Sequence, residues 1–268
     1  MIRPFQAAML QFQVDMGDVA ANEARAFRLL GEAAAGKAAL CVLPEMWSTG
    51  FAYDLNLPSL ARSTPGIVYR LRRFAGENGL VIVGSMPERI GAGVFNTTYV
   101  IDATGAVTGE YRKAHLFSPS GETDHFRRGA TARVAHSAVG TIGPEICYDI
   151  RFPELSRKYF LEGATLICVS AQWPTVRKAH WALLNAARAI ENQLHVVAVN
   201  AVGRSGDFHY SGGSIAVAPT GDVVASADDS EGVTFATIDP AKVDEFRRRI
   251  PCAQDRNERA YRKTRPAR

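Results

Sequence analysis

The sequence predicts an α/β fold, arranged as a four-layer αββα sandwich of two similar halves. Apolar runs bounded by Gly, Pro or Asp alternate with longer amphipathic segments, which is the pattern of strands interleaved with helices. Two segments, TTYVIDATGAVTGEY and GSIAVAPTGDVVASA, resemble each other, and each is typical of two strands joined by a Thr-Gly turn. The run AALCVLPE likewise resembles ATLICVSAQWP. Two α/β halves packed sheet on sheet would account for both similarities.

The individual elements follow from where the apolar period changes along the chain. Strands are expected at residues 7–11, 39–43, 80–85, 97–101, 165–169, 196–200, 214–218 and 233–238, and a further strand ends at Ile146. Helices are expected at residues 19–35, 66–78, 152–162, 178–192 and 240–249. On the helix at 178–192 the spacing predicts one buried stripe, made of Trp181, Leu184, Ala187, Ala189 and Ile190.

Composition fits a soluble globular protein with a large core. The 268 residues are 47% hydrophobic and 22% charged, which excludes disordered and collagen-like chains. We expect one main domain over residues 1–250, with two tightly packed halves as the alternative, and a basic C-terminal tail over 251–268. The N-terminus lacks the pattern of a secretion signal, and no apolar stretch approaches the ~20 residues of a membrane span. A cytoplasmic location is therefore expected.

The net charge of +4 comes from the C-terminal region. Residues 241–268 hold ten Lys or Arg and four Asp or Glu, so the rest of the chain carries a charge of −2. Such a segment can bind nucleic acid or a membrane, or it can be a solvated tail or subunit contact. Because no recognised nucleic-acid module accompanies it, we favour the second interpretation and expect neither a nucleic-acid nor a membrane partner.

The four cysteines are scattered, and none lies in a C-x-x-C pair or at zinc-ligand spacing. A disulfide framework and a structural metal site are therefore not expected. Cys41 and Cys168 lie inside apolar runs, where cysteine is usually a small buried hydrophobe. Cys147 differs, because it follows a strand and precedes a helix that starts near Pro153.

Three charged or nucleophilic residues lie at the ends of expected strands, where ligands bind in α/β proteins. Cys147 is either a buried thiol or a nucleophile, and a nearby cation such as Lys113 would favour its reactive thiolate. Glu45 is either a structural carboxylate or a general base. Lys113 is either a solvated edge charge or a fixed cation that stabilises an oxyanion.

The sequence segments around these residues resemble those of a known protein family. LPE…GF, YRKxHLF…GE and CYDxRFPE resemble the three catalytic blocks of the nitrilase superfamily of carbon-nitrogen hydrolases, and later segments extend the resemblance over nearly the whole chain. It implies a nitrilase-like fold with Cys147 as nucleophile, Glu45 as general base, and Lys113 facing the oxyanion. Glu122 would position the substrate and the lysine, although it can also be a surface carboxylate. The chain departs from the family pattern at NAVG and at Ala218.

The resemblance also implies the reaction. Cys147 would form a thioester with the acyl group and release ammonia, the Tyr148 backbone N–H would help hold the oxyanion, and water would then release the acid. No metal or organic cofactor is required. Family members commonly form dimers, and IPCAQDRNERAY resembles the segment that contributes to those contacts, so we expect a homodimer or larger homo-oligomer.

The substrate class rests on a closer resemblance. LPEMWSTGF, HLFSPSGE and SAQWP are most similar to bacterial omega-amidases, which implies a terminal amide of a 2-oxo acid such as 2-oxoglutaramate or 2-oxosuccinamate. Such substrates carry a carboxylate, which an arginine would bind. The candidates for that arginine are Arg151, Arg177 and Arg204, and those for aromatic pocket walls are Phe51, Phe117 and Trp173.

Other functions stay open from sequence alone. An N-carbamoyl amidohydrolase or aliphatic amidase would use the same chemistry on another acyl group, and a true nitrilase is a further member of the same class. A papain-like thiol hydrolase would need a histidine base near Cys147. An inactive scaffold or binding module would keep the fold and have no turnover.

Overall fold

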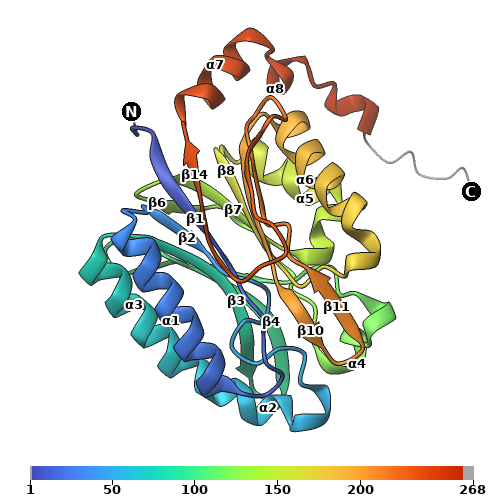
Figure 1. Ribbon diagram of the computed structural model, residues 1–268. Helices are drawn as coiled ribbons and strands as arrows, with labels where there is room; N and C mark the ends of the chain where they lie inside the picture. The colour runs from blue at the N-terminus through green and yellow to red at the C-terminus, as the bar shows by residue number, and fades with distance from the viewer. Residues whose placement is uncertain (1, 262–268) are drawn as a thin grey trace, which may run out of the picture.

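The computed structural model describes residues 2–261, which form two six-stranded sheets packed face to face between helices (Figure 1). In spatial order, the first sheet contains β14 (Gly232–Ile238), β1 (Phe5–Gln11), β2 (Leu40–Val42), β3 (Val81–Ile90), β4 (Gly93–Ile101) and β5 (Val107–Arg112). The second contains β13 (Val223–Ser226), β12 (Ile215–Val217), β9 (His195–Asn200), β8 (Leu166–Ala171), β7 (Gly140–Ile146) and β6 (Ala135–Ser137).

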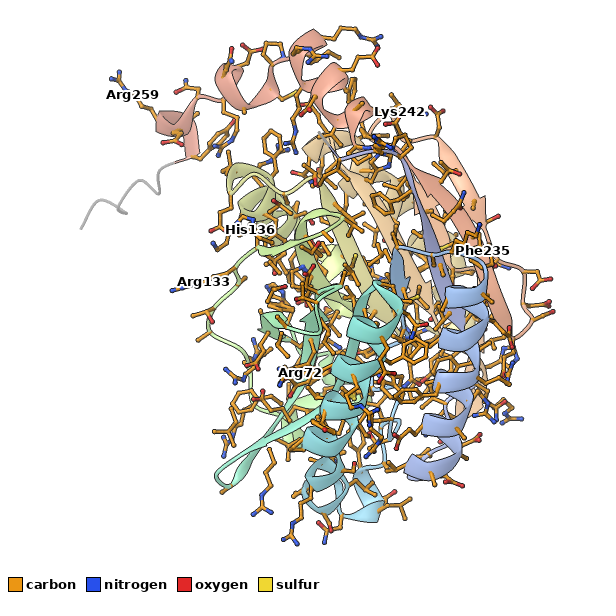
Figure 2. The ribbon with its side chains drawn as sticks, turned by 90° about the vertical axis from the view of Figure 1, so that its left-hand side faces the viewer. Arg72, Arg133, His136, Phe235, Lys242 and Arg259 are labelled. Atoms are coloured by element: carbon orange, nitrogen blue, oxygen red, sulfur yellow. The ribbon has the colours of Figure 1, made fainter. Side chains whose placement is uncertain are left out.

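The outer layers are helical. α1 (Val19–Ala35) and α3 (Thr64–Asn78) cover the first sheet, whereas α5 (Pro153–Leu161) and α6 (Lys178–Asn192) cover the second. Figure 2 shows α1 and α3 side by side, with Phe235 of β14 next to α1 and Arg72 on α3. The predicted four-layer αββα sandwich is confirmed.

The alternation of side chains along the strands creates three stacked hydrophobic layers. In β8, Leu166 and Cys168 face the other sheet, while Ile167 and Val169 face α5 and α6. Cys41 in β2 likewise faces the helices of its own half. Because both faces of each central strand are buried, these strands are continuously apolar, and this made them visible in the sequence.

Shorter elements complete the chain. They are α2 (Leu57–Leu60), α4 (Glu122–His125), the hairpin of β10 (Val202–Ser205) and β11 (Phe208–Ser211), α7 (Ala241–Arg249), α8 (Cys252–Asp255), and 3-10 turns at Tyr53–Leu55, Ala61–Ser63, Ser118–Ser120, Cys147–Arg151, Thr175–Arg177 and Glu258–Tyr261. None of the helices in residues 2–261 is long and apolar enough to cross a membrane. The C-terminal helices lie at one end of the sandwich, where Figure 2 labels Lys242 and Arg259. Residues 262–268 of the basic tail lie outside the described residues.

The expected strands and helices are confirmed, including the two similar hairpins, β4–β5 and β12–β13. The stripe predicted on α6 is wrong in part, because Ile190 is 47% exposed. The buried face of α6 instead contains Trp181, Asn185, Arg188, Ala189 and Asn192. The buried arginine is tolerated because its Nε and Nη2 both donate to the Ile150 carbonyl, at 2.9 and 2.6 Å.

Candidate active site

Four of the predicted site residues meet at the edge where the two sheets come together. The Lys113 ammonium donates to Glu45 Oε1 at 2.7 Å and to Glu122 Oε1 at 2.8 Å. The exposed fraction is 0% for Lys113 and Glu45, 2% for Glu122 and 8% for Cys147. A lysine buried to this extent persists only when it is paired, and here two carboxyl groups share one ammonium group.

Glu45 is fixed from both sheets. It follows β2 of the first sheet, and its Oε1 accepts a hydrogen bond from Asn96 Nδ2 of β4 at 2.8 Å. From the second sheet, the Gln172 backbone N–H donates to Glu45 Oε2 at 3.0 Å, and Gln172 Nε2 donates to the Glu45 carbonyl at 2.9 Å. Sequence reasoning missed Asn96 and Gln172 as positioning residues, although Gln172 lies within the quoted SAQWP segment.

Lys113 and Glu122 are held by the segment that follows β5. The Lys113 backbone N–H donates to the Asn96 carbonyl at 2.9 Å, which continues the pairing of β4 with β5 by one residue. Glu122 begins α4, and its Oε2 accepts from the Phe117 backbone N–H at 3.0 Å. Glu122 is thus a buried partner of Lys113, which the surface-loop alternative did not anticipate.

Cys147 lies at a sharp turn directly after β7. Its φ of 46° is in the left-handed region, which non-glycine residues seldom adopt outside functional sites. Asp149 stabilises this turn, because its carboxylate accepts from the Ile146 backbone N–H at 3.0 Å and from the Tyr111 hydroxyl at 2.8 Å. At Gly143 of β7, a Cβ would lie 2.6 Å from the Tyr159 ring of α5, so only glycine lets that ring pack against the strand.

The electrostatics of the cluster favour a protonated thiol. Burial, and after it the Glu45 carboxylate, raise the pKa of Cys147 well above its ordinary value, and Lys113 opposes them only in part. Burial alone would lower the pKa of Lys113, but Glu122 and Glu45 outweigh it and raise that pKa well above the ordinary value. Lys113 lowers the Cys147 pKa, as expected of a nearby cation, but burial and Glu45 outweigh it, so the net shift favours the protonated thiol.

A cavity of about 250 Å³ opens onto Cys147, Glu45 and Glu122, which suits a small molecule. Five of the predicted binding residues line it: Phe51, Phe117, Tyr148, Arg151 and Trp173. Arg177 also lines the cavity, whereas Arg204 is exposed on β10 and does not. Sequence reasoning missed Tyr53 and Tyr210, which come from a 3-10 turn and from β11 and carry no recognisable motif.

None of the six histidines, all of which lie within the described residues, lines this cavity. His115, which lies within the YRKxHLF segment, places Nδ1 2.7 Å from Asp149 Oδ1 and stacks on Phe152 with ring centroids 3.7 Å apart. This geometry gives no support to a papain-like histidine base. Residues 2–261 also contain no group of three or more His, Cys, Asp or Glu side chains that could hold a metal ion.

Comparison with known proteins identifies the family. Residues 6–248 match the sequence pattern described as carbon-nitrogen hydrolase. The chain belongs to the carbon-nitrogen hydrolase family. This carbon-nitrogen hydrolase is 38% identical over 251 residues to a 2-oxoglutaramate amidase of Bacillus subtilis (strain 168), covering 92% of this chain and 95% of the relative. It is 35% identical over 219 residues to the omega-amidase YafV of Escherichia coli (strain K12), covering 81% of this chain and 84% of the relative.

Solved structures agree with this assignment. The CN-hydrolase superfamily protein XC1258 from Xanthomonas campestris has a TM-score of 0.86 and 30% identity, covering 95% of this chain and 98% of that one. The C. elegans NitFhit protein has a TM-score of 0.90 and 29% identity, covering 98% of this chain and 67% of that one. The nitrilase-like fold is confirmed, and the carbon-nitrogen hydrolase is an enzyme acting on carbon-nitrogen bonds other than peptide bonds.

Proposed function

We propose that this hydrolase cleaves the terminal amide of a small 2-oxo acid, such as 2-oxoglutaramate or 2-oxosuccinamate, to the acid and ammonia. The observation that carries this proposal is the buried set of Glu45, Lys113 and Cys147 at the base of a small cavity lined by aromatic rings and arginines. Relatives described as 2-oxoglutaramate amidase and omega-amidase, at 35–38% identity, support the same substrate class.

The proposed first stage forms a thioester. Cys147 Sγ attacks the amide carbon while Glu45 accepts the thiol proton, which is consistent with a thiol whose pKa is raised. Lys113 and the Tyr148 backbone N–H hold the oxyanion of the tetrahedral species. The carbon-nitrogen bond then breaks, and the departing nitrogen takes the proton from Glu45 and leaves as ammonia.

The proposed second stage releases the acid. Glu45 takes a proton from a water molecule, and the oxygen of that water attacks the thioester carbon. A second tetrahedral species forms at this carbon. The carbon-sulfur bond breaks, the acid leaves, and the departing Cys147 sulfur takes the proton from Glu45. Glu122 is the positioning partner, because its Oε1 accepts a second hydrogen bond from the Lys113 ammonium at 2.8 Å.

The test is ammonia release from 2-oxoglutaramate, 2-oxosuccinamate, glutamine, N-carbamoyl amino acids and a short aliphatic amide. Wild type, Cys147→Ala and the matched control Cys252→Ala are compared, because Cys252 is half-buried in α8 and borders no part of the cavity. Turnover of the 2-oxo amides that is lost only in Cys147→Ala supports the proposal. Faster turnover of another compound in the panel refutes the substrate, and no turnover at all favours the scaffold alternative.

We also propose a cytoplasmic homodimer or larger homo-oligomer. All four cysteines are unpaired, as is usual in a reducing compartment, and Leu183 and Ile190 of α6 are 70% and 47% exposed. Size-exclusion chromatography with light scattering tests the assembly. A monomer alone, at the composition-derived mass of 29.1 kDa, contradicts it.

A further inference from the structure

Arg151 and Arg177 are the two basic side chains among the described residues that line the cavity. Neither guanidinium forms an ion pair with a carboxylate of residues 2–261, although the chain pairs many of its other arginines. The Arg177 guanidinium makes no hydrogen bond within the described residues, and Arg151 makes one, from Nη2 to His180 Nδ1 at 3.1 Å. Half-buried guanidinium groups without an anion are poised to bind one that enters the cavity.

Aromatic rings of the cavity wall hold both guanidinium groups. The Arg177 guanidinium carbon lies 5.3 Å from the centroid of the Phe117 ring, and that of Arg151 lies 4.9 Å from the Trp173 ring. Trp173 Nε1 donates to the Arg177 carbonyl at 2.8 Å, so the ring that stacks on Arg151 also contacts the backbone of Arg177. Stacking on a fixed ring orients a planar guanidinium before the ligand arrives and so lowers the entropy cost of binding.

The catalytic end of the cavity cannot supply this positive charge. Glu45 and Glu122 share the single ammonium group of Lys113, so the cluster has no surplus cation to attract a carboxylate. Asp54 and Asp207 also border the cavity, but both are exposed to solvent, where their charges are screened. The arginines are therefore the groups that can stabilise a substrate carboxylate in the cavity that Cys147 also lines.

We infer that Arg177, assisted by Arg151, forms the subsite that binds the substrate carboxylate and selects anionic over neutral amides. This inference rests on the proposed function and adds which side chains read the acid end of the substrate. Arg177 is the stronger donor, because its guanidinium has no other hydrogen-bond partner in the described residues. Arg204, the third arginine that the sequence offered, is excluded because it lies outside the cavity.

The test compares kcat/KM for 2-oxoglutaramate and for its methyl ester, which has the same length and no negative charge. In wild type the acid is expected to be preferred. Arg177→Gln should lower kcat/KM for the acid by about 10- to 100-fold, the effect of losing a charge-assisted hydrogen bond, and leave the ester nearly unchanged. Arg151→Gln should show a smaller loss. Arg204→Gln is the matched control and should behave as wild type.

Each outcome separates the two proposals. If wild type prefers the ester or hydrolyses neither compound, the proposed function fails and the inference fails with it. If wild type prefers the acid and Arg177→Gln keeps that preference within about twofold, only the carboxylate subsite is overturned. Arg177→Lys keeps the positive charge but lacks the planar guanidinium, so it should recover part of the preference for the acid over the ester. If Arg177→Lys shows no more preference for the acid than Arg177→Gln, an electrostatic role of Arg177 is contradicted.

Discussion

Glu145 is a buried acid that the proposed reaction does not use, and it gives the sharpest prediction about stability. It lies in β7, two residues before Cys147, and is 0% exposed. Its Oε1 accepts from the Ser156 hydroxyl at 2.5 Å, whereas its Oε2 has no hydrogen-bond partner among the described residues. Burial raises the pKa of Glu145 to about 8, against an ordinary value of 4.5.

The raised pKa makes folding pH-dependent in a defined direction. Between pH 4.5 and pH 8 the unfolded chain has released the Glu145 proton and the folded protein still holds it, so rising pH favours unfolding. The free energy of unfolding should fall by about 1.4 kcal/mol per pH unit from this group, or roughly 4 kcal/mol between pH 5 and pH 8. Above pH 8 the loss is complete and the slope from Glu145 vanishes.

Glu145→Gln should remove this loss. The glutamine amide resembles the protonated acid, and its oxygen can still accept from Ser156, so the variant should match wild type near pH 5 and exceed its stability increasingly toward pH 8. Urea unfolding followed by tryptophan fluorescence, at fixed protein concentration and four pH values, measures the difference. Glu77→Gln on α3, where Glu77 is exposed, is the control. Wild-type and variant curves that stay parallel from pH 5 to pH 8 would refute the reasoning.

Three further predictions concern the site. Glu45→Gln should lower kcat for ammonia release by about 10²- to 10⁴-fold, the usual contribution of a general base, and a rate within tenfold of wild type would point to another base. Asp149→Asn should lower the free energy of unfolding by about 1–3 kcal/mol, because an amide NH₂ group then faces donors whose hydrogen bonds the carboxylate accepts. An unchanged urea midpoint would contradict this expectation. The rate of Cys147 alkylation by iodoacetamide should still rise with pH above pH 9, because the pKa of its thiol is raised. Cys147→Ala gives the background rate from the other cysteines. A rate that reaches a plateau by pH 8 would instead show a stabilised thiolate.

The sequence revealed those parts of the fold in which one physical effect dominates. Central strands such as β8 are buried on both faces, so they read as uninterrupted apolar runs, and the turn residues around them mark their ends. The inner face of α6 was predicted only in part, because hydrophobicity does not detect Arg188. Its burial depends on two hydrogen bonds to the Ile150 carbonyl, a partner that is 38 residues away in the chain.

The candidate site was predictable where its residues lie in short sequence motifs. Glu45, Lys113 and Cys147 each lie in a segment that resembles a family block, and their spatial convergence follows from strand ends meeting at one edge. Asn96, Tyr53 and Tyr210 carry no such signal, because they act through contacts with distant residues. The net rise of the Cys147 pKa was not predictable for the same reason, since the sequence suggests Lys113 as a nearby cation but shows neither the burial of the thiol nor its closeness to Glu45.

The arrangement of the site residues depends on how the two sheets pack against each other. Glu45 belongs to the first sheet and Cys147 and Gln172 to the second, and the Glu45 backbone N–H also donates to the Ala171 carbonyl at 3.4 Å. The proposed base and nucleophile therefore have a fixed separation only while the apolar layer between the two sheets keeps its packing. Because that layer is close-packed and of low compressibility, the proposed mechanism keeps its proton acceptor in one position through both stages. The same packing excludes water from Lys113, which strengthens its attraction for an oxyanion at the moment the charge develops.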